Sequence, residues 1–150
     1  MRILIQRVKK ASVTVSDKMV SEIGQGYLIL LGVEEADGPE DVQWLCSKVA
    51  RLRVFGDKTG AMNKSVMDVD GEVIVVSQFT LHASTKKGNR PSFIRAARPE
   101  TALTLYELFI THLSKELGKE VQTGTFGAMM DVALVNDGPV TIAIDSKVKE

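Results

Sequence analysis

The sequence predicts a mixed α/β fold: a layered β/β/α single domain, residues 1–150, with two helices packed on one side of the sheets. Three observations predict this fold class. Residues 27–33 are apolar at consecutive positions, which is typical of a strand covered on both faces, and residues 72–79 form a second buried strand around the apolar run 73–76. Residues 39–53 and 99–117 repeat apolar side chains with the period of an amphipathic helix. The strands do not alternate with helices throughout, so a doubly wound fold is not expected.

Strand-like segments dominate the start of the chain. Residues 3–6 and 11–15 are rich in β-branched and aliphatic side chains, and the polar residues 16–18 predict a turn into residues 19–23. The first helix begins with Pro39, a residue suited to the first turn of a helix. Its apolar face consists of Val42, Leu45, Cys46, Val49 and Leu52.

The second half of the chain contains the other helix and the last strands. Gly118 follows the helix at residues 99–117 and is placed to cap it in the left-handed conformation. Three further strands are expected: residues 121–126, 128–135 and 140–144. Residues 136–139, Asn-Asp-Gly-Pro, predict a turn between the last two strands.

Composition excludes several classes of protein. Nineteen Lys and Arg residues balance nineteen Asp and Glu residues, so any polyanion must bind to a local basic patch. A single cysteine, Cys46, excludes a disulfide framework and indicates a reducing compartment, which predicts a cytoplasmic protein. No apolar run is long enough for a membrane span or a signal peptide. His82 and His112 stand alone, and no phosphate-loop or dinucleotide motif occurs, so we expect neither a metal nor a cofactor.

Hydrogen-bonding and aromatic side chains terminate the buried strand at residues 72–79. Ser77, Gln78, Phe79 and Thr80 lie where a rigid strand presents chemistry to solvent. They are candidate catalytic residues; on composition alone, the simpler interpretation is that the polar side chains satisfy backbone groups where the strand frays. His82 follows Thr80 by two residues and would share its side of an extended strand, so a hydrolytic Thr–His pair is an alternative.

Two other segments are candidates for binding. Residues 136–141, Asn-Asp-Gly-Pro-Val-Thr, read most simply as a turn, but Gly138 has no Cβ and lets its backbone approach a ligand closely. Residues 86–98 contain five cations and no acid: Lys86, Lys87, Arg90, Arg95 and Arg98. This stretch either grips phosphates locally or forms a solvated loop before the second helix.

Taken together, four segments resemble those of the D-aminoacyl-tRNA deacylase family: residues 77–81 (SQFTL), 90–93 (RPSF), 123–130 (TGTFGAMM) and 136–141 (NDGPVT). The resemblance implies a homodimeric cytoplasmic hydrolase that cleaves the ester between a D-amino acid and the 3′-terminal adenosine of tRNA, and that also removes mischarged glycine. It implies a cis bond between Gly138 and Pro139, which project into the site of the other subunit.

The resemblance also suggests how the residues are used. Asn136, Gly138, Pro139, Phe126 and Met129 would bind substrate, and the five cations of residues 86–98 would bind the acceptor stem. A main-chain wall at Gly138 and Pro139 would admit Cα–H and reject an L side chain. No general base accompanies Thr80, which favours assistance by the terminal ribose 2′-OH over a threonine nucleophile. A non-catalytic nucleic-acid-binding module is the alternative function, since eukaryotic relatives are associated with DNA-unwinding elements.

Overall fold

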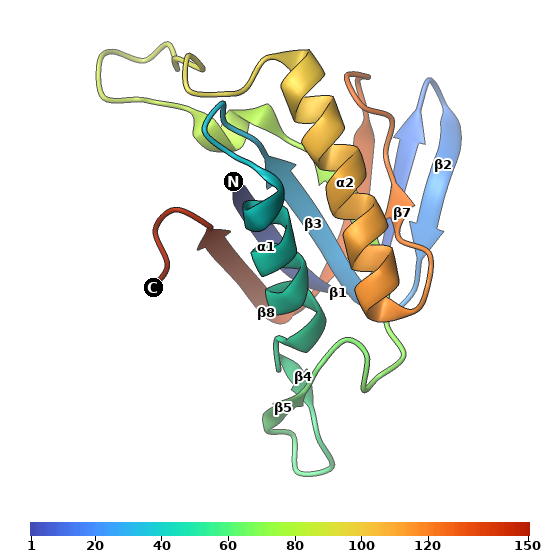
Figure 1. Ribbon diagram of the computed structural model, residues 1–150. Coiled ribbons are helices and arrows are strands. Elements are labelled where there is room, and N and C mark those ends of the chain that lie inside the picture. The colour runs from blue at the N-terminus through green and yellow to red at the C-terminus, as the bar shows by residue number, and fades with distance from the viewer.

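The computed structural model describes residues 1–150 and contains one main sheet, a small hairpin and two α-helices (Figure 1). The elements in chain order are β1 (Arg2–Val15), β2 (Lys18–Ile23), β3 (Gly26–Gly32), α1 (Pro39–Arg51), β4 (Phe55–Gly56), β5 (Met62–Lys64), β6 (Glu72–Ser77), the 3-10 turn η1 (Phe79–His82), α2 (Pro99–Leu117), β7 (Gln122–Thr123) and β8 (Asp131–Asp145). The expected mixed α/β class is confirmed.

The main sheet has six strands in the order β2-β1-β3-β6-β7, and β8 pairs with the opposite side of β1. β1 is antiparallel to β2, β3 and β8, whereas β3, β6 and β7 run parallel to one another. The carboxyl ends of β3, β6 and β7 therefore lie at the same edge of the sheet. β8 has one paired side only, so it forms a long edge of the sheet.

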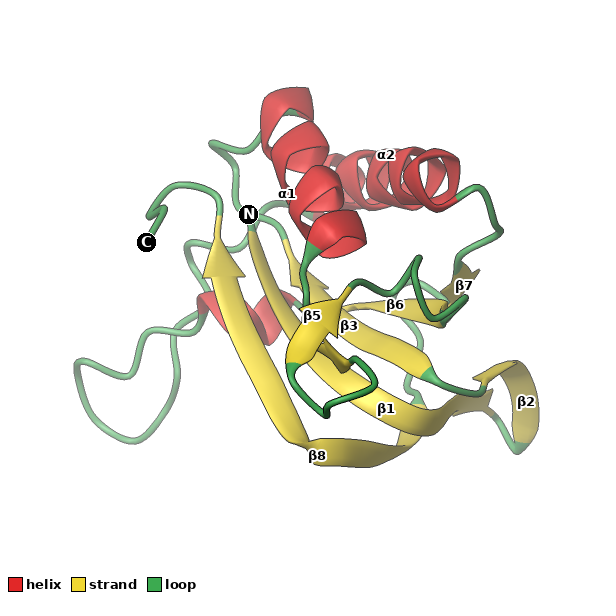
Figure 2. Ribbon diagram, turned by 90° about the horizontal axis from the view of Figure 1, so that it is seen from below, coloured by secondary structure: helices red, strands yellow, loops and turns green.

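Both helices cover the same face of the sheet (Figure 2). The main core between these layers contains Tyr27 and Ile29 of β3, Leu45 of α1 and Phe109 and Leu113 of α2, all of them fully buried. α2 ends at Gly118, whose φ of 66° is the left-handed cap that the sequence predicted. Neither helix has the length and apolar content needed to cross a membrane.

Several predicted boundaries were wrong. Residues 3–6 and 11–15 belong to a single strand, β1, and residues 131–145 form a single strand, β8, without the predicted turn at residues 136–139. Strands β1 and β8 pair along almost their whole length, and this pairing absorbs irregular residues as bulges. Only Gln122 and Thr123 form a strand in the segment expected at residues 121–126.

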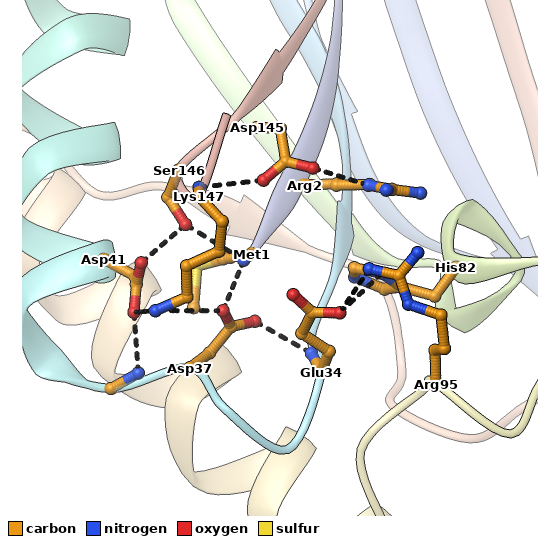
Figure 3. A network of polar contacts seen from close by, with 11 residues as sticks. Met1, Arg2, Glu34, Asp37, Asp41, His82, Arg95, Asp145, Ser146 and Lys147 are labelled. Carbon is orange, nitrogen blue, oxygen red and sulfur yellow. Dashed lines mark hydrogen bonds and ion pairs between the residues drawn. The ribbon is translucent and has the colours of Figure 1, made fainter. Parts of the chain in front are cut away.

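The first turn of α1 is tied to the end of β8 by Asp41. The Asp41 carboxylate accepts hydrogen bonds from the Gly38 N–H (2.9 Å), the Ser146 hydroxyl (2.6 Å) and the Lys147 ammonium (2.8 Å), as Figure 3 shows. Burial alone would raise the pKa of Asp41, but these donors outweigh it and lower the pKa to about 2. The carboxylate therefore stabilises the fold in its charged form.

Candidate active site

The residues predicted to be catalytic lie where β6 leaves the sheet. β6 ends at Ser77, and the Gln78 N–H donates to the Leu31 carbonyl of β3 at 2.8 Å. The chain then turns into η1 instead of continuing as a strand. Gln78 (φ −143°, ψ 84°) is neither helical nor fully extended, so it marks the point at which the direction changes.

This turn exposes hydrogen-bonding groups to solvent. Phe79 and Thr80 are its first two residues, and the first N–H groups of a helical turn have no acceptor within it. The Thr80 hydroxyl accepts a hydrogen bond from the Gln78 amide, and Thr80 is exposed. The geometry thus combines two backbone donors with one oriented hydroxyl, which suits an anionic oxygen.

His82 does not pair with Thr80. The tight turn directs His82 into the protein, where its side chain is 1% exposed, while Thr80 faces solvent. The expectation that both residues share one side assumed an extended strand, and the 3-10 turn removes it. The structure contains no group of three or more His, Cys, Asp or Glu side chains arranged to hold a metal ion.

The basic segment forms a loop beside this turn, coloured yellow-green in Figure 1. Its neck is closed by two hydrogen bonds between Ser84 and Ser92, of 2.8 and 2.9 Å. Phe93 packs edge-on against Phe79 with ring centroids 5.0 Å apart, although 55% of Phe79 is still exposed. All five predicted RNA-binding cations are exposed, and only Arg95 pairs with a carboxylate, Glu34.

Phe126 and Met129 lie on the segment between β7 and β8. Because β7 is parallel to β6, with Val75 opposite Thr123, this segment continues toward the same edge of the sheet as Ser77. Phe126 is half-buried against Tyr106, at 5.7 Å between ring centroids, whereas Met129 is 92% exposed. Burial raises the pKa of Tyr106 to about 12, so its hydroxyl stays protonated and donates to the Val75 carbonyl at 2.8 Å.

The Asn-Asp-Gly-Pro segment bulges out of the ladder between β1 and β8. Gln6 is opposite Thr141 and Val8 is opposite Asn136, so two steps along β1 correspond to five steps along β8. The Asn136 side-chain amide donates to the carbonyls of Arg7 and Val140, each at 3.0 Å, and closes the bulge. Gly138 and Pro139 are exposed at its tip, and the bond between them is cis, as the resemblance implies.

Arg7 holds this bulge from below, and the sequence analysis did not identify it. Its Nε donates to the Asp137 carbonyl at 3.1 Å and lies 3.4 Å from the Asp137 carboxylate. Its Nη1 donates to the Val54 carbonyl. A single arginine in a strand gives no sequence signal, because its role depends on pairing with residues about 130 positions away.

One chain does not bring the two parts of the predicted site together. The bulge lies beside Arg7 and Val8, which pair with Tyr27 and Gly26 at the start of β3. The η1 turn follows Gln78, which is bonded to Leu31 at the other end of β3. At about 3.3 Å per residue, the four to five residues between these positions span about 13–17 Å. Gly138 and Pro139 are therefore remote from Thr80 within one chain.

Comparisons with known proteins agree on one family. The model for D-Tyr-tRNA(Tyr) deacylase matches residues 4–145. The chain is 61% identical to a D-aminoacyl-tRNA deacylase of Bacteroides thetaiotaomicron and 59% identical to one of Flavobacterium johnsoniae, over 150 residues and 100% of both chains in each case.

Solved structures give the same fold. A c-Myc DNA Unwinding Element Binding Protein superposes with a TM-score of 0.89 at 42% identity, covering 97% of this chain and 98% of that chain. A probable eukaryotic D-amino acid tRNA deacylase superposes with a TM-score of 0.82, covering 95% of this chain and 97% of that chain. The second is only 16% identical, so its likeness concerns the fold alone.

Proposed function

Because the chain belongs to the D-aminoacyl-tRNA deacylase family of hydrolases, we propose that two copies form a homodimer with the deacylation sites at their interface. Each site hydrolyses the ester between a D-amino acid, or mischarged glycine, and the 3′-terminal adenosine of tRNA. The observation that supports this most directly is the separation of Gly138 and Pro139 from Thr80, since only another copy can bring them to the η1 turn. Because aminoacyl-tRNA is used in the cytoplasm, we place the enzyme in that compartment.

The outer surface of β8 favours association with a second copy. One long edge of β8 has no partner strand, and Val135 of β8 is 41% exposed. An open groove of about 710 Å³ lies alongside, with Leu4, Leu81, Ile142 and Ile144 in its lining. Leu81 belongs to η1, so a protomer that covers this groove would reach the catalytic turn.

Discrimination by chirality follows from main-chain atoms in this proposal. The enzyme must accept varied D side chains and refuse every L residue, so the discriminating contact lies at Cα. The tip at Gly138 and Pro139 is rigidly held through Arg7 and Asn136. Its carbonyl groups face Cα–H of a D residue or glycine, whereas an L residue would direct its Cβ into them.

The chemistry uses the exposed groups of η1. The N–H groups of Phe79 and Thr80 stabilise the developing oxyanion, Ser77 leads from β6 into the turn, and the Gln78 amide orients the Thr80 hydroxyl. No base lies within hydrogen-bonding distance of Thr80, because its one side-chain partner is the neutral Gln78 amide. The terminal ribose 2′-OH therefore assists hydrolysis, and Thr80 polarises the ester.

The surface around η1 and the basic loop binds RNA in this proposal. Phe79, Phe126 and Met129 lie near the same edge of the sheet and provide stacking surfaces for the terminal adenine. The basic loop beside them grips acceptor-stem phosphates through Lys86, Lys87, Arg90, Arg95 and Arg98.

Mixed dimers test the shared site. Phe79→Pro removes one backbone donor at the first residue of η1, a position that tolerates proline, and should lower kcat about 10²–10³-fold. Phe79→Ala is the control for loss of the ring. Coexpression of Phe79→Pro with Gly138→Ala should restore D-tyrosyl-tRNA deacylation, because one site of each mixed dimer then has both intact parts. Failure to restore it, when mixed dimers are demonstrated by mass spectrometry, would contradict a site made from two chains.

Substrate chemistry tests the role of Thr80. Thr80→Ala should retain appreciable turnover, whereas the ester of a D-aminoacyl-tRNA that ends in 2′-deoxyadenosine should be hydrolysed very slowly. The opposite pattern would identify Thr80 as the nucleophile.

A non-catalytic nucleic-acid-binding module is the second candidate, favoured by the 42% identity to the protein described as binding a DNA-unwinding element. Purified protein and chemically charged D-tyrosyl-tRNA separate the two functions. Rapid release of D-tyrosine, with L-tyrosyl-tRNA untouched, is expected of the enzyme and not of the module.

A further inference from the structure

The imidazole of His82 is a buried polar group without a hydrogen bond. Its side chain is 1% exposed, and neither ring nitrogen has a partner. An oxygen of the Glu34 carboxylate lies 3.7 Å from Nδ1, which is too long for a hydrogen bond. Buried polar groups are nearly always paired, so this one needs an explanation.

The His82 ring lies between the catalytic turn and the end of β3. It ends η1, and an added Cβ at Gly32 would be 3.1 Å from its Cδ2 and 3.0 Å from the Gln78 carbonyl oxygen. The ring and the turn are thus in close contact with the backbone of β3. A small movement of the His82 side chain would move the residues that present the Phe79 and Thr80 N–H groups.

Glu34 links the same ring to the basic loop (Figure 3). The oxygen that faces His82 also lies 3.1 Å from a guanidinium nitrogen of Arg95. Arg95 is 55% exposed, whereas the Glu34 side chain is 14% exposed. One carboxylate oxygen therefore faces an exposed cation on one side and a buried unpaired imidazole on the other.

We propose that His82 is a positioning residue that couples phosphate binding by Arg95 to the geometry of η1. This inference rests on the proposed function. When a phosphate attracts the Arg95 guanidinium, the Glu34 oxygen loses its cationic partner. The His82 Nδ1–H then donates to that oxygen, the 3.7 Å gap closes, and η1 is fixed for oxyanion binding. Arg2 holds the same turn by donating to the Leu81 carbonyl at 3.0 Å, so the movement is confined to the ring and its immediate backbone.

Two substitutions separate positioning from simple space filling. His82→Leu removes an unpaired polar group, so its melting temperature should equal or exceed that of the wild type, while kcat falls about fivefold or more. His82→Asn places an N–H on the same Cγ as Nδ1 and should recover most of the lost kcat. His112→Asn, on the half-buried face of α2, is the control. Wild-type kcat in His82→Leu, or no recovery in His82→Asn when that variant is folded, would overturn the proposal.

A second measurement does not depend on turnover. The chain has two histidines, so their ring signals in the NMR spectrum are assigned with His112→Asn. An acceptor-stem RNA hairpin that carries no amino acid should shift the His82 signal in the wild type and in Lys87→Gln, but not in Arg95→Gln. Binding of the hairpin without movement of the His82 signal would refute the coupling and leave the proposed function intact. No binding of the hairpin to the wild type would refute both.

Discussion

Replacement of Gly138 by alanine tests how the tip of the bulge is held. Gly138 has a φ of +126°, outside the conformations that alanine adopts readily. A Cβ at this position would lie 2.9 Å from Nη2 of Arg7 and 3.0 Å from Cγ2 of Val140. Both contacts are too short, so either the arginine or the bulge must move.

The expected loss of stability combines two contributions. A non-glycine residue in such a backbone conformation costs of order 1–3 kcal/mol. Displacement of Arg7 adds to this cost, because its guanidinium also donates to the Asp137 carbonyl at 3.1 Å. We expect Gly138→Ala to be about 3 kcal/mol less stable than the wild type, which corresponds to a fall in melting temperature of about 6–12 °C for a chain of this size.

Gly127→Ala is the matched control for this measurement. Gly127 also has a positive φ, +77°, but no atom lies within 4 Å of an added Cβ. It should lose only about 1 kcal/mol, from backbone strain alone. Urea unfolding of both variants at equal protein concentration gives the difference. If Gly138→Ala proved as stable as Gly127→Ala, close packing of Arg7 against the bulge would be refuted.

Three further predictions follow from burial and charge. The pKa of Asp41 in the folded protein is lowered to about 2 from its ordinary 3.8, so the stability that its carboxylate contributes is complete above pH ~4 and is lost as the pH falls toward 2. Asp41→Asn should therefore be about 2 kcal/mol less stable than the wild type at pH 7, and the unfolding free energies of the two proteins should converge between pH ~4 and 2. Burial, with a smaller effect of Glu116, raises the pKa of Cys46 to about 12, so Ellman's reagent should not react with the native protein at pH 8 but should label one thiol in urea; rapid native labelling would contradict the buried thiol. Replacement of Lys86 and Lys87 with Gln should reduce the slope of log affinity for tRNA against log salt by about 0.9 for each lysine that contacts a phosphate, and an unchanged slope would exclude both from the interface.

Much of the fold could be read locally. The bounds of α2, the left-handed Gly118 and the turn between β1 and β2 depend on residues within a few positions of each other, and all three predictions are confirmed. The consecutive apolar residues of β3 and β6 correctly indicated strands covered on both faces, because hydrophobic patterning reports burial directly. The small hairpin of β4 and β5 was missed, since its strands of two and three residues are too short for a pattern.

The candidate site divides in the same way. The order of the motifs along the chain was enough to identify residues 77–80 and 136–141 as candidates. The cations of the basic loop were also identified from the sequence. Two features were inaccessible to it: the bulge that presents Gly138 and Pro139, and the burial of His82 behind Thr80. A turn and a bulge use the same residue types, so only the strand opposite distinguishes them.

The sequence by itself determined the residue types of the site, the helices and the family resemblance, because each of these depends on local order along the chain. Only the tertiary structure decided that Arg7 supports the bulge, that Glu34 lies between His82 and Arg95, and that Gly138 lies at the far end of the sheet from Thr80. The physical reason is strand register: hydrogen bonds between β1, β3 and β8 fix which distant residues meet, and the register is set by the packing of the whole sheet.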